Sequence, residues 1–322
     1  MAASFLQPPT GSSPQTAIHL SQGAASFLKS QRSAFTLPWP LTLFLNTDSQ
    51  EKWAIYENTL LACLRTGDFD SAHVALNAMI DRFGKTNDRV VAMAGLYQEA
   101  TADDKKELEE ILEGYDDILK EDPTVFSIQK RRAALLKSMG RTAEAVTAVS
   151  ALLELSPTDA EAWAELSDLY FSQGLLEQSI HCLEEVLVVV PNAWNMHAKL
   201  GEVTYIAANR TEAAGEQSKL LAESMRRFCR SVELCDDYLR GYYGLKLATT
   251  QLLTSLPTQK KSQQSDLPPI ASVQKLNELA TAKLANILRR SSSGEKGWDG
   301  YSAAELAAVR QLLDKDTQKI QR

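Results

Sequence analysis

The fold is decided by the 34 residues from Glu161 to Trp194, which read EAWAELSDLYFSQGLLEQSIHCLEEVLVVVPNAW. Gly174 lies between the two halves of this stretch, and Pro191 lies near its end. Because glycine permits a tight turn and proline cannot continue a helix, the stretch predicts two short helices joined at Gly174. Each half carries apolar side chains at helical spacing: Trp163, Leu166 and Tyr170, then Leu183 and Val186.

The closing proline recurs with a fixed period. Pro123, Pro157 and Pro191 each stand 34 residues after the last. Small residues recur in register with the predicted turns, as the pairs Gly67/Ala72, Gly140/Ala145 and Gly174/Ser179. A period of about 34 residues is typical of tetratricopeptide repeats, in which helix pairs stack side by side. The sequence therefore predicts an all-α protein built as a tetratricopeptide-repeat superhelix, an α-solenoid that presents a curved binding surface.

Some units fit the repeat less well. Gln129 and Arg132 stand where side chains of the repeat usually pack. Further along, the period slips, because Asp236 stands about eleven residues beyond the place of the next proline. We interpret Asn209–Gly215 as an enlarged turn within this lengthened unit.

The composition along the chain predicts four segments. Residues before Asp48 include no acid and are rich in Ser, Gln, Ala and Pro, which predicts a disordered or partner-dependent extension. A polar stretch with prolines separates the repeats from the helical C-terminal end. The expected segments are the extension at 1–46, the repeat array at 47–253, the linker at 254–270 and C-terminal helices at 271–322.

The C-terminal segment predicts two helices. Ala271–Arg290 is amphipathic, and Tyr301–Leu313 follows a break. Ser302 and Glu305 form the S-x-x-E pattern of a capping box at the start of the second helix. We expect this pair to cap the array, and the alternative is that it docks a partner.

Charge and hydropathy exclude several classes of protein. The 322 residues carry a net charge of −7, which disfavours a general role in binding nucleic acid. No segment approaches the roughly 18 apolar residues that a membrane-spanning helix needs, and no secretory signal pattern is present. The acid-free N-terminal stretch, with Lys29 and Arg32, weakly resembles a mitochondrial transit peptide, which leaves a mitochondrial location as an alternative.

Catalytic and metal-binding motifs are missing from the sequence. It has no phosphate loop, no G-x-S-x-G and no H-E-x-x-H. The four cysteines form no C-x-x-C pair, and His181 and Cys182 are neighbours that point in different directions on a helix. We therefore expect no enzyme activity, no cofactor and no metal site.

The groove of the array is the expected binding surface. In such repeats the first helix of each pair turns one stripe towards the inner curve. With Trp163 as the fourth residue of its unit, the stripe runs from basic residues in one unit to acidic and aromatic residues in the next two. The expected partner-binding residues are Lys130, Lys137, Glu161, Asp168, Phe171, Glu202 and Tyr205.

Side-chain size within the stripe supports this expectation. Ala134, Ala164 and Ala198 stand at one level, where they would leave room for a ligand. Phe171 and Tyr205 are expected to be exposed, and exposed aromatic side chains are favoured at interfaces. The alternative is that the charged side chains of the stripe only solvate the surface.

Several strings of residues resemble one family. They are RVVAMAGLYQEA (89–100), YDDILKEDPT (115–124), EAWAELSDLY (161–170), HCLEEVLVVVPNA (181–193) and YYGLKLA (242–248). Together they resemble subunit 2 of the endoplasmic reticulum (ER) membrane protein complex, over roughly residues 53–253.

This resemblance implies a non-catalytic scaffold subunit at the cytosolic face of the ER membrane. The complex inserts tail-anchored and multi-spanning membrane proteins, and the subunit would hold cytosolic segments of membrane-embedded and soluble partner subunits in its groove. Its association with the membrane would be indirect, through those partners. The alternatives are a soluble repeat adaptor of another multiprotein assembly and a mitochondrial assembly factor.

Overall fold

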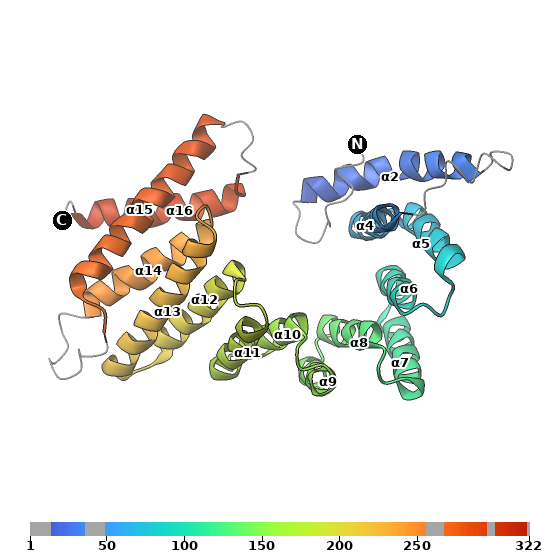
Figure 1. Ribbon diagram of the computed structural model, residues 1–322, viewed down its shortest axis with the longest axis horizontal. Helices are drawn as coiled ribbons and strands as arrows, with labels where there is room; N and C mark the ends of the chain where they lie inside the picture. Colours follow the sequence, from blue (N-terminus) through green and yellow to red (C-terminus); the bar gives the residue numbers. More distant parts are fainter. Residues whose placement is uncertain (1–13, 36–48, 256–266, 295–299, 321–322) are drawn as a thin grey trace. The chain divides into compact units, whose positions relative to one another are not determined.

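The computed structural model describes residues 14–35, 49–255, 267–294 and 300–320 of the chain. Every element in these ranges is an α-helix, which confirms the predicted fold class (Figure 1). The chain divides into two compact units, Met1–Leu155 and Ser156–Arg322. Each unit is built from helix pairs of the predicted kind.

The first unit has its apolar core at its N-terminal end. Side chains from α2, α4, α5 and α6 meet there, including the buried Leu28, Tyr56, Leu60 and Met79. The helices of this unit are α2 (Pro14–Phe35), α4 (Gln50–Thr66), α5 (Phe69–Phe83), α6 (Asp88–Thr101), α7 (Lys105–Glu121), α8 (Phe126–Ser138) and α9 (Thr142–Leu155).

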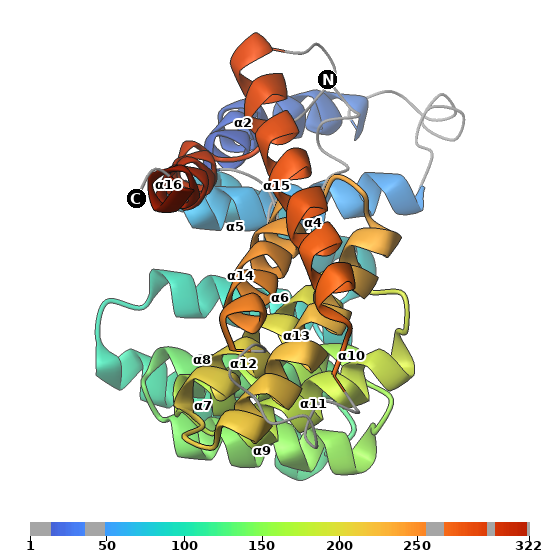
Figure 2. The same cartoon turned by 90° about the vertical axis from the view of Figure 1, so that its left-hand side faces the viewer.

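The second unit has a larger core. It joins α12, α13 and α14 to the C-terminal helices, and α15 lies along α14 (Figure 2). The helices of this unit are α10 (Ala160–Ser172), α11 (Leu176–Val189), α12 (Trp194–Arg210), α13 (Ala214–Leu234), α14 (Leu239–Ser255), α15 (Ile270–Ser293) and α16 (Ala303–Ile320).

The predicted turns are where the sequence places them. Gly67, Gly140 and Gly174 have φ angles of 77°, 78° and 77°, in the left-handed region that glycine adopts without strain. The repeat prolines follow helix ends, since α7 ends at Glu121, α9 at Leu155 and α11 at Val189.

A repeated hydrogen bond explains the unusual Gln129. In three first helices, the fourth residue reaches back to the carbonyl oxygen of the repeat proline that precedes the helix. Gln129 Nε2 donates to Pro123, Trp163 Nε1 donates to Pro157 at 2.9 Å, and His197 Nε2 lies 3.0 Å from the Pro191 oxygen. The side chain at this repeat position therefore needs a ring or amide N–H in addition to its packing contacts.

Arg132 also has a specific partner in place of apolar packing. Its Nε lies 2.5 Å from Asp116 Oδ1, so the side chain ties α8 to α7. A charged residue can occupy this repeat position because its partner comes from the preceding helix.

The slip in the repeat period comes from longer helices. The prediction of an enlarged turn at Asn209–Gly215 is wrong. α12 has 17 residues and α13 has 21, whereas α10 and α11 have 13 and 14. Helix α12 continues to Arg210, and the Thr211 hydroxyl donates to the Ala207 carbonyl at 3.0 Å. Only residues 211–213 separate the two helices.

The N-terminal stretch differs from the expected disorder within residues 14–35, where α2 forms. Ala17, Leu20, Ala24 and Leu28 lie at helical spacing and are buried against α4 and α5. The Thr66 hydroxyl donates to Ser21 Oγ at 2.8 Å, which adds a polar contact to this packing. The rest of the expected 1–46 extension lies outside the described residues.

The C-terminal helices form as predicted. Val273, Ala280, Leu284 and Ile287 of α15, with Val309 of α16, complete the core of the second unit. The capping box is present, since Glu305 N donates to Ser302 Oγ at 3.3 Å and Ser302 N donates to Glu305 Oε2 at 3.1 Å. Most of the expected linker, residues 256–266, lies outside the described residues.

Candidate functional site

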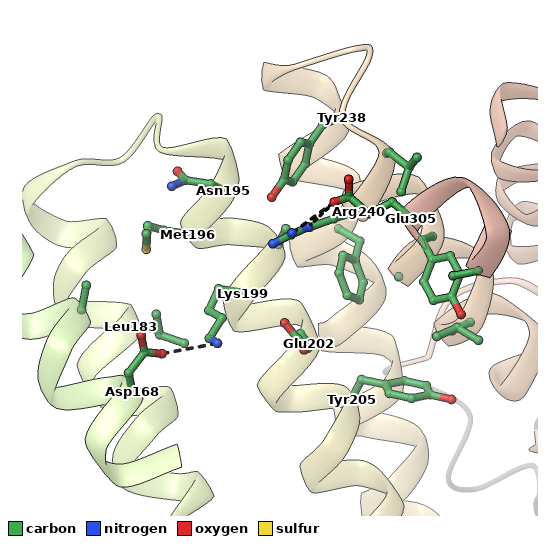
Figure 3. A pocket seen from close by; sticks show the side chains of 18 residues that line it. Asp168, Leu183, Asn195, Met196, Lys199, Glu202, Tyr205, Tyr238, Arg240 and Glu305 are labelled. Carbon is green, nitrogen blue, oxygen red and sulfur yellow. Dashed lines mark hydrogen bonds and ion pairs between the residues drawn. The ribbon is translucent and has the colours of Figure 1, made fainter. Parts of the chain in front are cut away.

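A pocket of about 510 Å³ opens in the second unit (Figure 3). Three first helices, α10, α12 and α14, supply most of its lining, and α16 supplies one wall. The apolar part of the lining comes mainly from Ala164, Leu183, Ala198, Phe228, Tyr243 and Leu247. The pocket is thus a section of the inner surface that the repeat register predicts, closed on one side by the last helix.

Glycines on two helices allow the pocket floor to form. The ring of Phe228, from α13, lies between Gly201 of α12 and Gly244 of α14. A Cβ atom at Gly244 would overlap this ring, and one at Gly201 would lie 3.1 Å from it. The absence of side chains at these two positions lets α12 and α14 approach the same ring.

Two ion pairs stand on opposite walls of the pocket (Figure 3). Asp168 Oδ1 on α10 lies 3.3 Å from Lys199 Nζ on α12. The same ammonium group lies 5.0 Å from the centroid of the Phe171 ring, within the range of a cation–π contact. On the other wall, Arg240 Nε and Nη2 both lie 3.1 Å from Glu305 Oε1.

Glu202 gives the pocket its charge. It stands one helical turn after Lys199, is exposed, and has no ion-pair partner among the residues that the structure describes. The other charged residues of the lining form the two pairs, so Glu202 leaves the pocket with one net negative charge. Burial raises the pKa of the nearby Tyr238, and the Glu202 carboxylate adds to this effect.

Hydrogen bonds hold α16 at the pocket wall. Tyr301 Oη accepts from the Leu239 amide at 3.0 Å and donates to the Asp237 carbonyl. Burial alone would raise the pKa of Glu305, but hydrogen bonds from Ser302 and Arg240 outweigh it and lower the pKa. Glu305 is therefore ionised at neutral pH and remains an acceptor for Arg240.

The structure brings three of the predicted groove residues together. Asp168, Glu202 and Tyr205 all line the pocket. Phe171 lies beside them through its contact with Lys199, while Glu161 is in the first turn of α10 and outside the lining. Both aromatic side chains are half-buried, so the expectation that Phe171 and Tyr205 are fully exposed is wrong. Each packs against an apolar cluster of the unit.

The two predicted basic residues lie elsewhere. Lys130 and Lys137 are on α8, in the first unit, where Lys130 is half-buried and Lys137 is exposed. Their role in binding a partner stays a prediction.

The pocket residues that the sequence analysis missed include three on α14 and one on α16. Arg240, Tyr243 and Leu247 stand three and four residues apart on α14, so the stripe could have been extended by one helix. The slip in the period hid this, because the register could not be carried beyond α12. Glu305 was recognised only as a capping residue, since nothing in the sequence indicates its contact with Arg240.

Comparison with known proteins gives a consistent result. A family model described as the EMC2 TPR-like repeat domain matches residues 73–218. The chain is 34% identical over 241 residues to the TPR repeat protein oca3 of Schizosaccharomyces pombe, covering 72% of this chain and 82% of that protein. It is 30% identical over 221 residues to ER membrane protein complex subunit 2 of Saccharomyces cerevisiae, covering 67% and 72%.

The chain belongs to the ER membrane protein complex subunit 2 family. The resemblance that the sequence strings indicated is thereby confirmed, and the family is one of tetratricopeptide-repeat proteins. Among solved structures, a tetratricopeptide repeat protein from Parabacteroides merdae matches 82% of this chain and 98% of its own, with 16% identity and a TM-score of 0.42.

Among the described residues, no helix is long and apolar enough to cross a membrane, and no three His, Cys, Asp or Glu side chains are grouped to hold a metal ion. Burial raises the pKa of the Cys63, Cys182 and Cys229 thiols to about 11, so these thiols are protonated and weakly reactive at neutral pH. Nothing in the comparisons supports the mitochondrial alternative.

Proposed function

We propose that this protein is a non-catalytic scaffold subunit of the ER membrane protein complex. Relatives at about 30% identity are named as subunit 2 of that complex, and the family model is a repeat domain. The complex inserts tail-anchored and multi-spanning membrane proteins, and this subunit contributes contacts and no chemistry. Its partners are other subunits, both membrane-embedded and soluble, and they hold it at the cytosolic face of the ER membrane.

The pocket of the second unit is the observation that carries the binding part of this proposal. Its apolar floor is open to one bulky side chain, and the Glu202 carboxylate stands unpaired among the described residues beside that floor. A partner segment with an apolar residue next to a lysine or arginine fits both features. Burying one such side chain contributes about 1.5–3 kcal/mol, and a rim ion pair adds up to about 1 kcal/mol.

A single pocket is too small to hold a permanent subunit. An obligate interface usually buries about 2,000 Å² or more, because association and ordering of a partner segment both oppose binding. Repeat proteins reach such areas by binding long segments along several units. We therefore propose the pocket as one anchor within a longer contact that includes the Glu161 and Phe171 region of α10. The Lys130 and Lys137 side chains of α8 are proposed as a separate partner contact of the first unit.

Charge reversal at Glu202 tests the anchor. The variant Glu202→Lys should repel the basic partner residue and lower co-purification of complex subunits from mild-detergent extracts by about fivefold at low salt. Glu212→Lys is the matched control, because Glu212 is also exposed in this unit but lies outside the pocket. Lys130→Glu with Lys137→Glu tests the first unit in the same assay.

Three outcomes would count against the proposal. Equal recovery of subunits with Glu202→Lys and Glu212→Lys would exclude the pocket as an anchor. Recovery of every partner from the Lys130/Lys137 variant at high salt would exclude α8. Capture of a different assembly by the unaltered chain would favour the adaptor alternative.

A further inference from the structure

A second pocket, of about 500 Å³, lies in the first unit and was not indicated by the sequence. It opens between α4 and α6, and side chains of α5 form its floor. Its lining comprises Ser49, Gln50, Trp53, Ala54, Glu57, Met79, Phe83, Asn87, Arg89, Val90 and Met93. Since α4 and α6 are the first helices of their pairs, this pocket also belongs to the inner surface of its repeats.

The walls of this pocket suit a bulky apolar side chain. The Trp53 and Phe83 rings meet edge to face with centroids 4.9 Å apart, and Phe83 is 41% exposed. Met79 and Met93 complete the apolar lining with flexible, polarisable side chains that adapt to different shapes. Aromatic and methionine side chains around an open hollow are characteristic of surfaces that bind apolar faces of helices.

Arg89 presents a cation on the solvent side of the pocket lining. Arg89 and Glu57 form a bidentate pair, with Nε–Oε1 at 3.1 Å and Nη2–Oε2 at 2.5 Å. The Arg89 side chain is 75% exposed and that of Glu57 only 17%, so the cation faces the incoming ligand. Lys52 Nζ lies 5.4 Å from the Trp53 ring centroid, and Arg82 Cζ lies 5.4 Å from that of Phe83.

We propose that this pocket docks an acidic amphipathic helix of another protein. A Phe, Leu or Met of that helix enters between Trp53, Phe83 and Met93, and a carboxylate one turn away pairs with the exposed face of Arg89. The second-unit pocket differs, because its lining has one net negative charge from Glu202. The proposal rests on the geometry of the first unit and holds whether or not the complex assigned above is the correct one.

The test uses the full chain and two fluorescein-labelled helical peptides of roughly 15 residues. Both carry one central Phe, and they differ only in having Glu or Lys one helical turn before and after it. Measured by fluorescence anisotropy at low salt, the Kd of the acidic peptide should be about fivefold lower than that of the basic peptide. The ratio of the two Kd values should fall as the salt concentration rises.

Two variants separate shape from charge. Ala54→Phe fills the pocket, so it should raise the Kd of the acidic peptide by about tenfold or more. The double variant Glu57→Arg with Arg89→Glu keeps an ion pair while reversing the sign of its exposed member, so it should reverse the peptide preference. Glu233→Arg with Arg230→Glu is the matched control, because both members of this pair are exposed and lie in the other unit.

The outcomes decide the proposal in each direction. Reversal by the Glu57/Arg89 swap, with no change in the Arg230/Glu233 control, supports it even if Ala54→Phe fails to fold. Equal binding of both peptides, or binding that survives in folded Ala54→Phe, would overturn it. Absence of binding to the full chain, which would follow if the chain's own residues covered the pocket, would overturn it as well.

Discussion

Two regions of the molecule pack an aromatic ring against a glycine in contrasting ways. In the first unit, the Tyr115 ring of α7 lies against Gly95 of α6, where a Cβ atom would overlap it. In the second, the Phe228 ring of α13 lies against Gly244 of α14. The Tyr115 hydroxyl extends into a polar network, whereas Phe228 lies within the largest apolar core of its unit.

The network in the first unit joins three helices. Tyr115 Oη donates to Glu99 Oε1 at 2.6 Å, and the Arg131 guanidinium pairs with the same carboxylate. The side chains of Glu99 and Arg131 are 11% and 23% exposed, so the pair is largely shielded from water. The comparison indicates that one repeat architecture tolerates either a charged or an apolar junction, and that the two should respond to different perturbations.

The largest expected effect is at the apolar junction. Gly244→Ala should lower the free energy of unfolding by about 3 kcal/mol, because the new methyl group and the Phe228 ring cannot occupy the same space. Urea unfolding followed by circular dichroism measures the change. Gly114→Ala is the control, since Gly114 lies within α7 with nothing within 4 Å of its Cβ position, and that variant should be neutral or more stable by up to about 1 kcal/mol.

A double variant sharpens this test. If the ring causes the loss, Gly244→Ala combined with Phe228→Ala should destabilise less than the sum of the two single changes. Additive effects would contradict the account of the junction.

The next effect is at the charged junction. Arg131→Met should destabilise by about 2–3 kcal/mol, because it leaves the shielded Glu99 carboxylate without its cation. The measurement is the same urea titration, and hydrogen exchange should place the loss in α6–α8. A change below about 0.5 kcal/mol would show that water replaces the guanidinium freely.

The smallest expected effect concerns the Tyr115 hydroxyl. Tyr115→Phe should lower stability at neutral pH by about 1 kcal/mol through the lost hydrogen bond. Burial, and then the hydrogen bond to Glu99, raises the pKa of Tyr115 above its ordinary value of about 10. The folded state therefore holds this proton more tightly, and its contribution is complete below about pH 10 and lost as pH rises further.

The variant should accordingly lose stability less steeply than the unaltered chain above about pH 10. Parallel unfolding curves for the two proteins across this range would contradict the assignment. Phe228→Leu, which adds and removes no titrating group, is the control for the slope.

Much of this architecture could be predicted from the sequence because it depends on local residue types. Gly140 and Gly174 mark turns, Pro157 and Pro191 mark helix ends, and the Ser302–Glu305 pattern caps a helix. Contacts between helices could not be predicted in the same way. The pairing of Arg240 with Glu305 spans 65 residues, and no spacing rule connects them.

The candidate sites likewise combine features that local spacing predicts with features that depend on contacts between helices. Asp168, Glu202 and Tyr205, which line the second-unit pocket, could be selected from the sequence because helical spacing places such residues on one face. Their role in binding a partner stays a prediction. The pocket of the first unit was missed because its walls combine α4, α5 and α6, and the open space depends on how far these helices diverge. The helix α2 was missed because few charged residues mark its ends, although its apolar stripe is regular.

The most direct test of the scaffold proposal is photo-crosslinking from the second-unit pocket inside intact ER membranes. A photoreactive phenylalanine analogue at Tyr205 is activated, and the captured peptide is identified by mass spectrometry, with the exposed Gln178 of α11 as the control position. The account predicts capture of a cytosolic segment of another subunit of the ER membrane protein complex at Tyr205 and not at Gln178. Capture only of this chain's own residues, or equal capture at both positions, would contradict it.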